Sequence, residues 1–456
     1  MTSRGSIAPD SALDTIVALA TPPGRGAIAM VRLSGPGAFD IAARHVRSWP
    51  PEPRRPHLSD IVSHDEKLDE ALVTVFPSPN SFTGEDTVEI STHGGHLVPA
   101  TIAAALTLSG ARQALPGEFT RRAVLNGKLD VLQAEAIGDL IDARSHAMQK
   151  AALGQLDGGL SNRLTELRMQ LLELESLIAY DVDFPEEDDG PIAPARIERA
   201  TAVILQSLSS LLATVPIGEL VREGALVVIA GPPNVGKSSL FNALLGRSRA
   251  IVTEIPGTTR DALEAVVDTG KWPIRLVDTA GLRDTDDQLE KLGIQVSERY
   301  LSAADLVLAC ADDTNILNTL GEAIARHTGG PVIPVRTKAD LVAGSDQLKE
   351  SGALWISAHS GAGLSALTGA IDAAIDAHQS IGVDAPMLTT ARHRHAVETA
   401  YAEAAEFERV WKEEKLPAMV AAVHLRTAVV ALEELVGSIE IEDVLDRVFS
   451  SFCVGK

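Results

Sequence analysis

Apolar and polar residues occur in short runs along the first quarter of the chain, a pattern that predicts strands. Residues 14–35 read as a strand, a loop rich in proline and glycine, and a second strand. Further strand candidates at 71–76 and 88–92 flank the turn-rich P-S-P-N-S-F-T-G-E-D. We therefore expect residues 1–125 to form a small α+β domain.

Helical spacing replaces this pattern in the next part of the chain. Apolar residues recur at intervals of three and four, which predicts one face of a single long helix carrying Leu153, Leu156, Leu160, Leu164, Leu167, Leu171, Leu174 and Ile178. The acidic D-V-D-F-P-E-E-D-D-G ends it, and a second helix-rich stretch reaches about residue 219. Helical spacing resumes after about residue 377, with Pro417 at a helix start. We expect a helical domain in two parts, 126–220 and 379–456.

A third pattern fills the chain between these two helical parts. Within 221–378, apolar β-type runs alternate with helical patterns; the runs are 225–229, 274–277, 306–309, 332–335 and 354–356. This alternation is typical of a parallel, doubly wound sheet with helices on both faces. The sequence predicts a multidomain chain with an α/β domain inserted into a helical one.

A glycine-rich loop follows the first strand of this α/β domain. Residues 231–238 read G-P-P-N-V-G-K-S and lead into a helical pattern. Glycines at this spacing let backbone N–H groups turn inward around phosphate, and the helix N-terminus adds its dipole. Lys237 would reach the β and γ phosphates, and Ser238 would bind Mg²⁺. A chance glycine-rich turn would not need a strand before it and a helix after it. The predicted contacts are Asn234, Val235, Gly236, Lys237, Ser238 and Ser239.

Two later motifs match the metal and γ-phosphate contacts of such a site. G-T-T-R-D at 257–261 offers Thr259 as a second magnesium ligand. Asp278 ends a strand, where a carboxylate holds the metal, usually through water, and Gly281 can sense the γ phosphate through its N–H. Further nucleotide contacts are expected from Thr253, Thr258, Thr279 and Ala280.

The base contacts predict GTP rather than ATP. T-K-A-D at 337–340 and S-A at 357–358 follow two later strands, so Thr337, Lys338, Asp340, Ser357 and Ala358 form the predicted base site. The Asp340 carboxylate would accept from guanine N1–H and N2–H, and such sites discriminate by about 10⁴. The motif commonly begins with asparagine, so the role of Thr337 toward guanine stays open.

Hydrolysis needs a group other than the usual glutamine. Leu282 stands where Ras-like enzymes carry the glutamine that orients the attacking water. Leucine cannot do this. A carboxylate within 284–290, a monovalent cation or a residue of a partner are the alternatives.

Composition narrows the location and the partners. With 62 acidic and 40 basic residues the net charge is −22, so RNA would need a local basic patch or a partner protein. Arg121, Arg122 and Lys128 form the clearest such patch, or else a solvated helix face. Two cysteines build no disulfide framework, and neither a signal peptide nor an apolar run of about 20 residues is evident. We expect a cytoplasmic protein without a membrane span.

Seven separate segments resemble the tRNA-modification GTPase family MnmE, also called TrmE. They are T-P-P-G-R-G (21–26), N-S-F-T-G-E-D (80–86), P-G-E-F-T (116–120), N-G-K-L-D (126–130), Q-A-E-A (133–136), D-F-P-E-E-D (183–188) and F-C-V-G-K (452–456). The resemblance covers nearly the whole chain. It implies an α+β folate-binding N-terminal domain that also dimerises, a helical domain, and an inserted α/β P-loop GTPase domain.

The resemblance also implies an activity and its partners. A homodimer would hydrolyse GTP to GDP and phosphate in a heterotetramer with the FAD-dependent protein MnmG, or GidA. Together they would add an aminomethyl or carboxymethylaminomethyl group to carbon 5 of the tRNA wobble uridine, with the one-carbon unit taken from 5,10-methylenetetrahydrofolate. The alternative is a GTP-switched ribosome or RNA assembly factor, a class that usually carries a basic RNA-binding module.

Site residues carry over from the family to matching positions of this sequence. Potassium ligands fall on Asn234, Thr253, the backbone of Ile255 and Thr258, and the catalytic glutamate falls on Glu290. Potassium would supply positive charge where other enzymes use an arginine, and Glu290 would position water. Folate contacts fall on Arg32, Glu89, Lys128 and Lys456.

Overall fold

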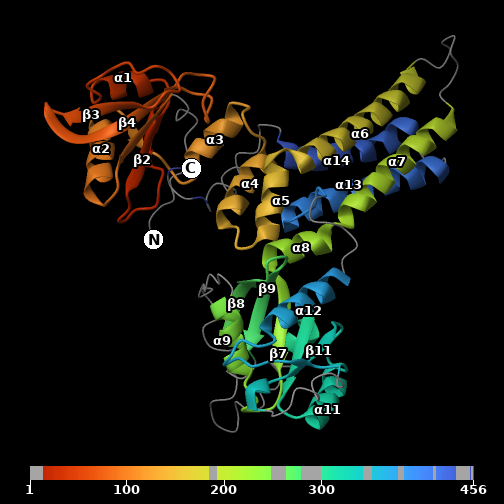
Figure 1. Ribbon diagram of the computed structural model, residues 1–456. Helices are drawn as coiled ribbons and strands as arrows, with labels where there is room; N and C mark the ends of the chain where they lie inside the picture. The colour runs from red at the N-terminus through yellow and green to blue at the C-terminus, as the bar shows by residue number, and fades with distance from the viewer. Residues whose placement is uncertain are drawn as a thin grey trace, which may run out of the picture. The chain divides into compact units, whose positions relative to one another are not determined.

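Figure 1 shows the computed structural model of the protein. It describes residues 14–183, 193–247, 263–278, 299–341, 352–377, 385–413 and 417–437, together with Phe452 and Gly455. The contacts divide the chain into two compact units, one of Met1–Gly138 with Glu433–Lys456 and one of Asp139–Leu432. The boundaries predicted at 125, 220 and 378 stay predictions.

The first unit is built on one sheet. Its strands are β1 (Ile16–Leu19), β2 (Ile28–Ser34), β3 (His57–Ser63), β4 (Glu66–Phe76), β5 (Thr87–His93) and β6 (Arg112–Gln113), in the order β3-β4-β5-β2-β1-β6. Neighbours are antiparallel except β1 and β6. Alternate residues such as Val31, Leu33 and Ile90 form a core with α1 (Ala38–Ala43) and α2 (Leu97–Leu108). The strands predicted in this region are confirmed, whereas β3 and β6 were not predicted.

Two helices complete the described part of this unit. In α3 (Glu118–Leu125), Phe119 is fully buried against β1 residues Ile16 and Ala18. In α4 (Val131–Asp142), Val131 and Ala134 pack with Phe452 near the end of the chain. A methyl group on Gly138 would lie 3.2 Å from the Phe452 ring, so a small residue fits there.

The second unit contains the predicted doubly wound sheet. Its strands are β7 (Ala225–Ala230), β8 (Leu263–Asp268), β9 (Pro273–Asp278), β10 (Leu306–Ala311), β11 (Val332–Arg336) and β12 (Leu354–Trp355), in the order β12-β11-β10-β7-β9-β8. All neighbours are parallel except the β8–β9 hairpin. The five predicted strands are confirmed, and β8 was not predicted.

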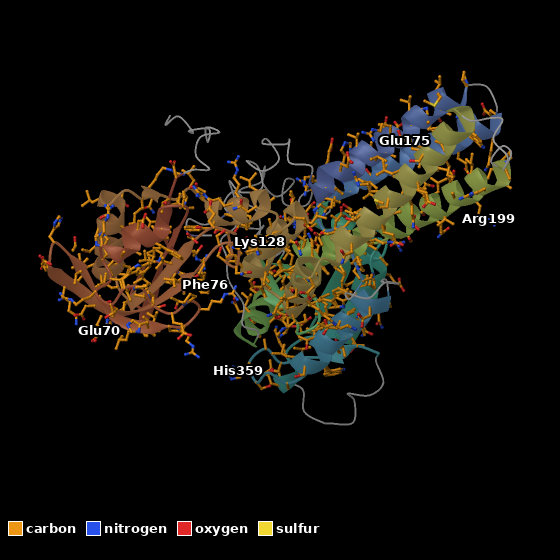
Figure 2. The ribbon with its side chains drawn as sticks, turned by 90° about the horizontal axis from the view of Figure 1, so that it is seen from above. Glu70, Phe76, Lys128, Glu175, Arg199 and His359 are labelled. Carbon is orange, nitrogen blue, oxygen red and sulfur yellow. The ribbon has the colours of Figure 1, made fainter. Side chains whose placement is uncertain are left out.

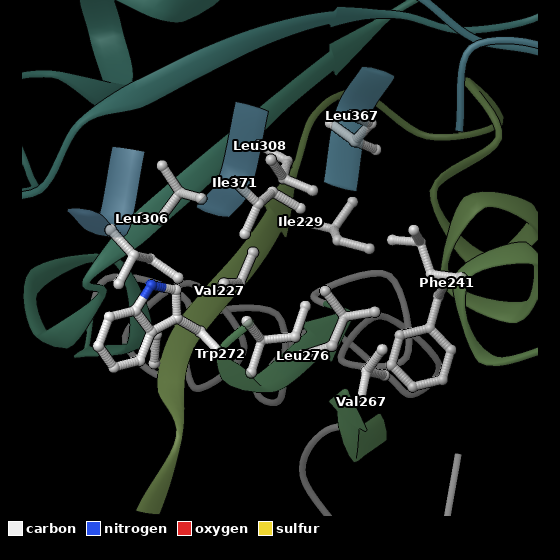
Figure 3. Packing of buried hydrophobic residues seen from close by; sticks show 14 of the residues in the cluster. Val227, Ile229, Phe241, Val267, Trp272, Leu276, Leu306, Leu308, Leu367 and Ile371 are labelled. Atoms are coloured by element: carbon white, nitrogen blue, oxygen red, sulfur yellow. The ribbon is translucent and has the colours of Figure 1, made fainter. Parts of the chain in front are cut away.

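Helices cover both faces of this sheet. Val227, Ile229 and Leu308 pack with Leu367 and Ile371 of α12 (Leu364–Ala377), and α9 (Lys237–Arg247) joins the same core through Phe241 (Figure 3). On the opposite face, residues of β7 and β10 pack with α11 (Thr314–Ile324). Strands buried on both sides in this way read as continuous apolar runs, which is why they were visible in the sequence.

Further helices that lie wholly or mostly in this unit are α5 (His146–Leu156), α6 (Gly159–Asp183), α7 (Pro194–Leu212), α8 (Val215–Glu223), α13 (Ala391–Glu413) and α14 (Ala418–Val436). Glu175 of α6 and Arg199 of α7 mark two of them in Figure 2. Helix α14 begins directly after Pro417, as predicted.

The prediction of one continuous helix from Leu153 to Ile178 is wrong. The chain breaks at D-G-G, where Gly158 has φ +86° and separates α5 from α6. Glycine tolerates this left-handed conformation better than other residues, and it commonly ends helices. Leu153 is consequently 43% exposed on α5, while the six predicted residues from Leu160 to Ile178 are buried on α6.

The segment that enters the α/β part and the segment that leaves it pack closely against each other. The Thr214 hydroxyl, just before α8, accepts a 3.1 Å hydrogen bond from Leu388 N. A methyl group on Gly218 of α8 would lie 2.0 Å from the Leu388 carbonyl oxygen. Arg394 of α13 forms a 2.7 Å ion pair with Glu219. Because α8 precedes β7 and Leu388 follows α12, these contacts bring together the two ends of the inserted part.

Among the described residues, Pro194–Glu223 is long and apolar enough by length and composition to cross a membrane, and 33% of its most apolar part is buried in the structure. This stretch consists of two helices, α7 and α8, separated at Ala213 and Thr214.

Candidate functional site

The glycine-rich loop starts under a severe steric constraint. Strand β7 is buried throughout, and Gly231 follows it directly. A methyl group on Gly231 would lie 2.1 Å from the carbonyl oxygen of Cys310 in the neighbouring β10. Only a residue without a side chain can pass there. Asn234 and Gly236 follow with φ of +60° and +98°. These left-handed positions turn the backbone around the loop before α9 begins at Lys237.

The phosphate and magnesium residues converge at the start of α9. Lys237 is 5% exposed, and its Nζ donates a 2.7 Å hydrogen bond to the Pro232 carbonyl within the loop. The Ser238 hydroxyl donates a 2.6 Å hydrogen bond to Asp278 Oδ2, and Asp278 is fully buried at the end of β9. A hydroxyl beside a carboxylate supplies the hard oxygen atoms that Mg²⁺ prefers. The residues present therefore fit the predicted metal.

Cys310 lies against the same site but stays a thiol. Burial raises its pKa to about 12, although the positive charge of Lys237 opposes this and the negative charge of Asp278 adds to it. The thiolate is the reactive form of cysteine. Cys310 is therefore a packing residue at neutral pH.

Thr337 is the first residue of the T-K-A-D motif (337–340, here called the base loop), and it contacts the glycine-rich phosphate loop (231–238). Its hydroxyl donates a 2.5 Å hydrogen bond to the Val235 carbonyl and lies 3.2 Å from the Ala311 carbonyl, and its N–H also donates to Ala311 O. Thr337 is 5% exposed. The threonine therefore has a structural role that needs no asparagine amide.

The other base-site residues lie on the same edge. Asp340, in the short helix η3 (Ala339–Leu341), is exposed, and a hydrogen bond from the buried Ser357 hydroxyl is the main cause that lowers its pKa. The charge of His359 adds a smaller lowering of the same pKa. Ala339 N donates to Ile356 O at 3.0 Å, which holds η3 beside the segment that carries Ser357 and Ala358. The structure thus brings Thr337, Lys338, Asp340, Ser357 and Ala358 together.

Several predicted residues lie outside the described residues. They are Thr253, Ile255, Thr258, Thr259, Thr279, Ala280, Gly281, Glu290 and Lys456. Their roles therefore stay predictions. The predicted residues of the phosphate loop, 234–239, are all described and lie together at its turn into α9.

Two of the predicted folate residues face each other in the first unit. Arg32 of β2 is the direct cross-strand neighbour of Glu89 of β5, and Arg32 Nη2 lies 2.7 Å from Glu89 Oε1. The Arg32 guanidinium carbon also lies 5.6 Å from the ring centres of Phe82 and Phe119. Sequence reasoning did not select these two aromatics, although both belong to matching segments, N-S-F-T-G-E-D and P-G-E-F-T.

The third described folate candidate, Lys128, belongs to an adjoining pair of turns. Its Nζ donates a 3.0 Å hydrogen bond to Pro79 O, and Asn126 Nδ2 donates to Thr83 O at 2.7 Å. A methyl group on Gly84 would lie 3.0 Å from Asn126 Cβ, so the turns pack closely. Lys128 is labelled in Figure 2.

The basic patch expected at 121–128 is not formed as predicted. Arg121 and Arg122 are 7% and 5% exposed, so they are neither a surface for RNA phosphate nor a solvated helix face. Arg122 pairs with Glu85 at 3.1 Å and with Glu118 at 3.0 Å. Because buried charges need such partners, these arginines have a structural role inside the domain.

Known proteins resemble this chain along nearly all of its length. Residues 15–128 match a family model described as the GTP-binding protein TrmE N-terminus, and residues 131–453 match the MnmE helical domain. The tRNA modification GTPase MnmE of Methylobacterium radiotolerans is 42% identical over 97% of this chain and 99% of that protein. Proteins of the same name are 42% identical in Moorella thermoacetica, with 97% and 99% covered, and 38% identical in Aquifex aeolicus, with 97% and 100% covered.

The buried hydroxyl of Thr337 generates a first prediction. Thr337→Val should weaken GDP binding by roughly tenfold. Removal of the hydroxyl leaves the buried Val235 carbonyl without its hydrogen-bond donor, at a cost of about 1–3 kcal/mol. Thr337→Ser keeps the hydroxyl and should bind GDP within about threefold of the parent. Titration calorimetry with GDP measures both. Equal affinities of the parent and Thr337→Val would show that the Val235 contact does not support the site.

Proposed function

The chain belongs to the MnmE family of tRNA modification GTPases and is a GTP hydrolase in tRNA modification, and we propose that potassium activates its hydrolysis and that folate supplies its one-carbon unit. The observation that carries the GTPase part of this function is the hydrogen bond between Ser238 and Asp278 at the turn of the phosphate loop. It supports a metal-assisted phosphate site where β7 and β9 end.

The phosphate site would work through charge and position. Backbone N–H groups of 234–239 would bind the β and γ phosphates, and Lys237, now bonded to Pro232 O, would turn its Nζ to the phosphate oxygens. Ser238 and Thr259 would hold Mg²⁺ directly, with Asp278 acting through water. When bound, the metal neutralises negative charge on the transferring phosphoryl group.

Base selection would rest on an ionised Asp340. The Ser357 hydroxyl lowers the pKa of Asp340, so the carboxylate stays charged at neutral pH and can accept both guanine N–H groups. Adenine offers no such donor pair. This complementarity supports GTP as the substrate.

Because Leu282 stands in place of the glutamine that orients water, other groups must assist hydrolysis. Potassium held by Asn234, Thr253, the Ile255 carbonyl and Thr258 would place positive charge near the transferring phosphoryl group. Asn234 suits this role because it is an exposed residue on a left-handed turn of the loop. Glu290 would then orient the attacking water.

The N-terminal domain would bind a 5,10-methylenetetrahydrofolate. Arg32 and Glu89 offer a guanidinium and a carboxylate that can hydrogen-bond to a flat heterocycle, and the exposed ring of Phe82, 5.6 Å from the Arg32 guanidinium carbon, can stack on it. Lys128 and Lys456 would add positive charge for the acidic part of the cofactor.

We propose a cytoplasmic homodimer that forms a heterotetramer with the FAD-dependent MnmG and acts on the tRNA wobble uridine.

Hydrolysis should depend on potassium and on Glu290. Single-turnover GTP hydrolysis should be fast in potassium chloride and slow in sodium chloride at equal ionic strength. Glu290→Ala should lower the rate constant by about 10²-fold with nearly unchanged GTP affinity, as expected when a group that orients water is lost. Asp287→Ala, a change in the same acidic stretch, should retain the parent rate. Equal rates in the two salts would eliminate the cation, and a parent rate for Glu290→Ala would eliminate the glutamate.

Folate binding should depend on Lys128. Calorimetric titration with 5-formyltetrahydrofolate should show saturable binding to the parent protein. Lys128→Ala should weaken it about tenfold, the effect of one lost charge-assisted hydrogen bond. Lys67→Ala removes a lysine paired with Asp60 on the β3–β4 hairpin and should change nothing. An absence of saturable binding to the parent would contradict the folate site.

A further inference from the structure

An ion pair joins the end of β10 to the predicted base loop. Asp312 directly follows β10, and its Oδ2 lies 2.8 Å from Lys338 Nζ. The residue before it, Ala311, accepts a hydrogen bond from the N–H of Thr337, and its carbonyl oxygen lies 3.2 Å from the Thr337 hydroxyl. Two consecutive residues at the end of β10 therefore contact two consecutive residues that follow β11. Asp312 belongs to none of the motifs assigned above.

The charges around Asp312 favour this one partner. The hydrogen bond from Lys338 is the largest cause of the lowered pKa of Asp312, and the positive charge of Arg336 adds to it. Arg336 itself bonds the Thr314 hydroxyl, and its guanidinium carbon lies 4.6 Å from the centre of the Trp355 ring. Because Arg336 is engaged elsewhere, Lys338 is the direct partner of the Asp312 carboxylate.

The pair restricts a long side chain next to the base-reading carboxylate. Lys338 lies between Thr337, which is fixed to the phosphate loop, and the loop that carries Asp340; its backbone has φ +55°. With Cα fixed by the turn and Nζ fixed by Asp312, the four-carbon stem is held between two points. Such stems provide apolar surface while their charged end stays in polar surroundings.

We propose that Asp312 is a positioning residue of the guanine site, which holds the Lys338 stem as a surface on which the bound base packs. This inference rests on the proposed base site at Asp340. The stem would contact the face of the base, whereas Asp340 reads its edge. Asp312 should therefore govern affinity for the purine ring without governing the choice between purines.

Titration calorimetry on the full chain tests this with GDP and with IDP, which lacks the N2 amino group. Asp312→Asn should weaken both nucleotides by about three- to fivefold, the range for a half-exposed ion pair. The ratio of GDP to IDP affinity should be unchanged, and KM for GTP should rise with kcat constant. Asp312→Glu should restore part of the affinity because it restores the carboxylate.

A double-mutant cycle separates positioning from a general structural effect. In a Lys338→Ala background, Asp312→Asn should cause no further loss, because the side chain that it positions is gone. Asp376→Asn is the matched control, since Asp376 pairs with Lys271 elsewhere in the same α/β part. It should bind GDP like the parent.

Each other outcome overturns the inference. Parent affinity in Asp312→Asn, or an equal loss in the Lys338→Ala background, would show that the pair does not position the lysine. A reduced GDP to IDP ratio would show that the substitution disturbs Asp340 instead. If the parent itself binds GDP and ADP equally, the proposed guanine site fails and the inference fails with it.

Discussion

The contact between Gly231 and the Cys310 carbonyl sets the course of the phosphate loop. A side chain at Gly231 would begin 2.1 Å from that oxygen, so the chain can pass from β7 into the loop only as glycine. The loop then brings the Val235 carbonyl to the Thr337 hydroxyl and Ser238 to Asp278. Phosphate, metal and base residues from separate strands thus depend on one close approach between β7 and β10.

The sequence predicted the parts of the fold whose signals are local and regular. Five parallel strands appeared as apolar runs, and the loop after β7 was visible from its glycine spacing. Strand β8 was missed because an antiparallel edge strand lacks such a run. The break between α5 and α6 was missed because the three- and four-residue spacing of apolar residues continues across Gly158. The left-handed backbone of Gly158 is set by the folded structure and does not alter that spacing. Thr337 could be placed in a motif, but its bond to Val235 depends on strands about one hundred residues apart.

The N-terminal domain shows how charge can mislead a reading from sequence alone. Arg121 and Arg122 looked like a basic surface, yet both are buried, and Arg122 pairs with Glu85 and Glu118. The partners lie in other segments, so the pairing was invisible before folding. Because Arg121 and Arg122 are buried, any contact with RNA phosphate would need other groups of this acidic chain or a partner protein.

The most direct measurement of the central claim, a guanine site read by Asp340, is the affinity of the parent and of Asp340→Asn for GTP and xanthosine triphosphate. An amide at this position complements the altered edge of xanthine and leaves guanine with a mismatched partner. We expect the parent to prefer GTP and the substitution to reverse this preference. A parent that binds both nucleotides equally, or a variant that still prefers GTP, would contradict it.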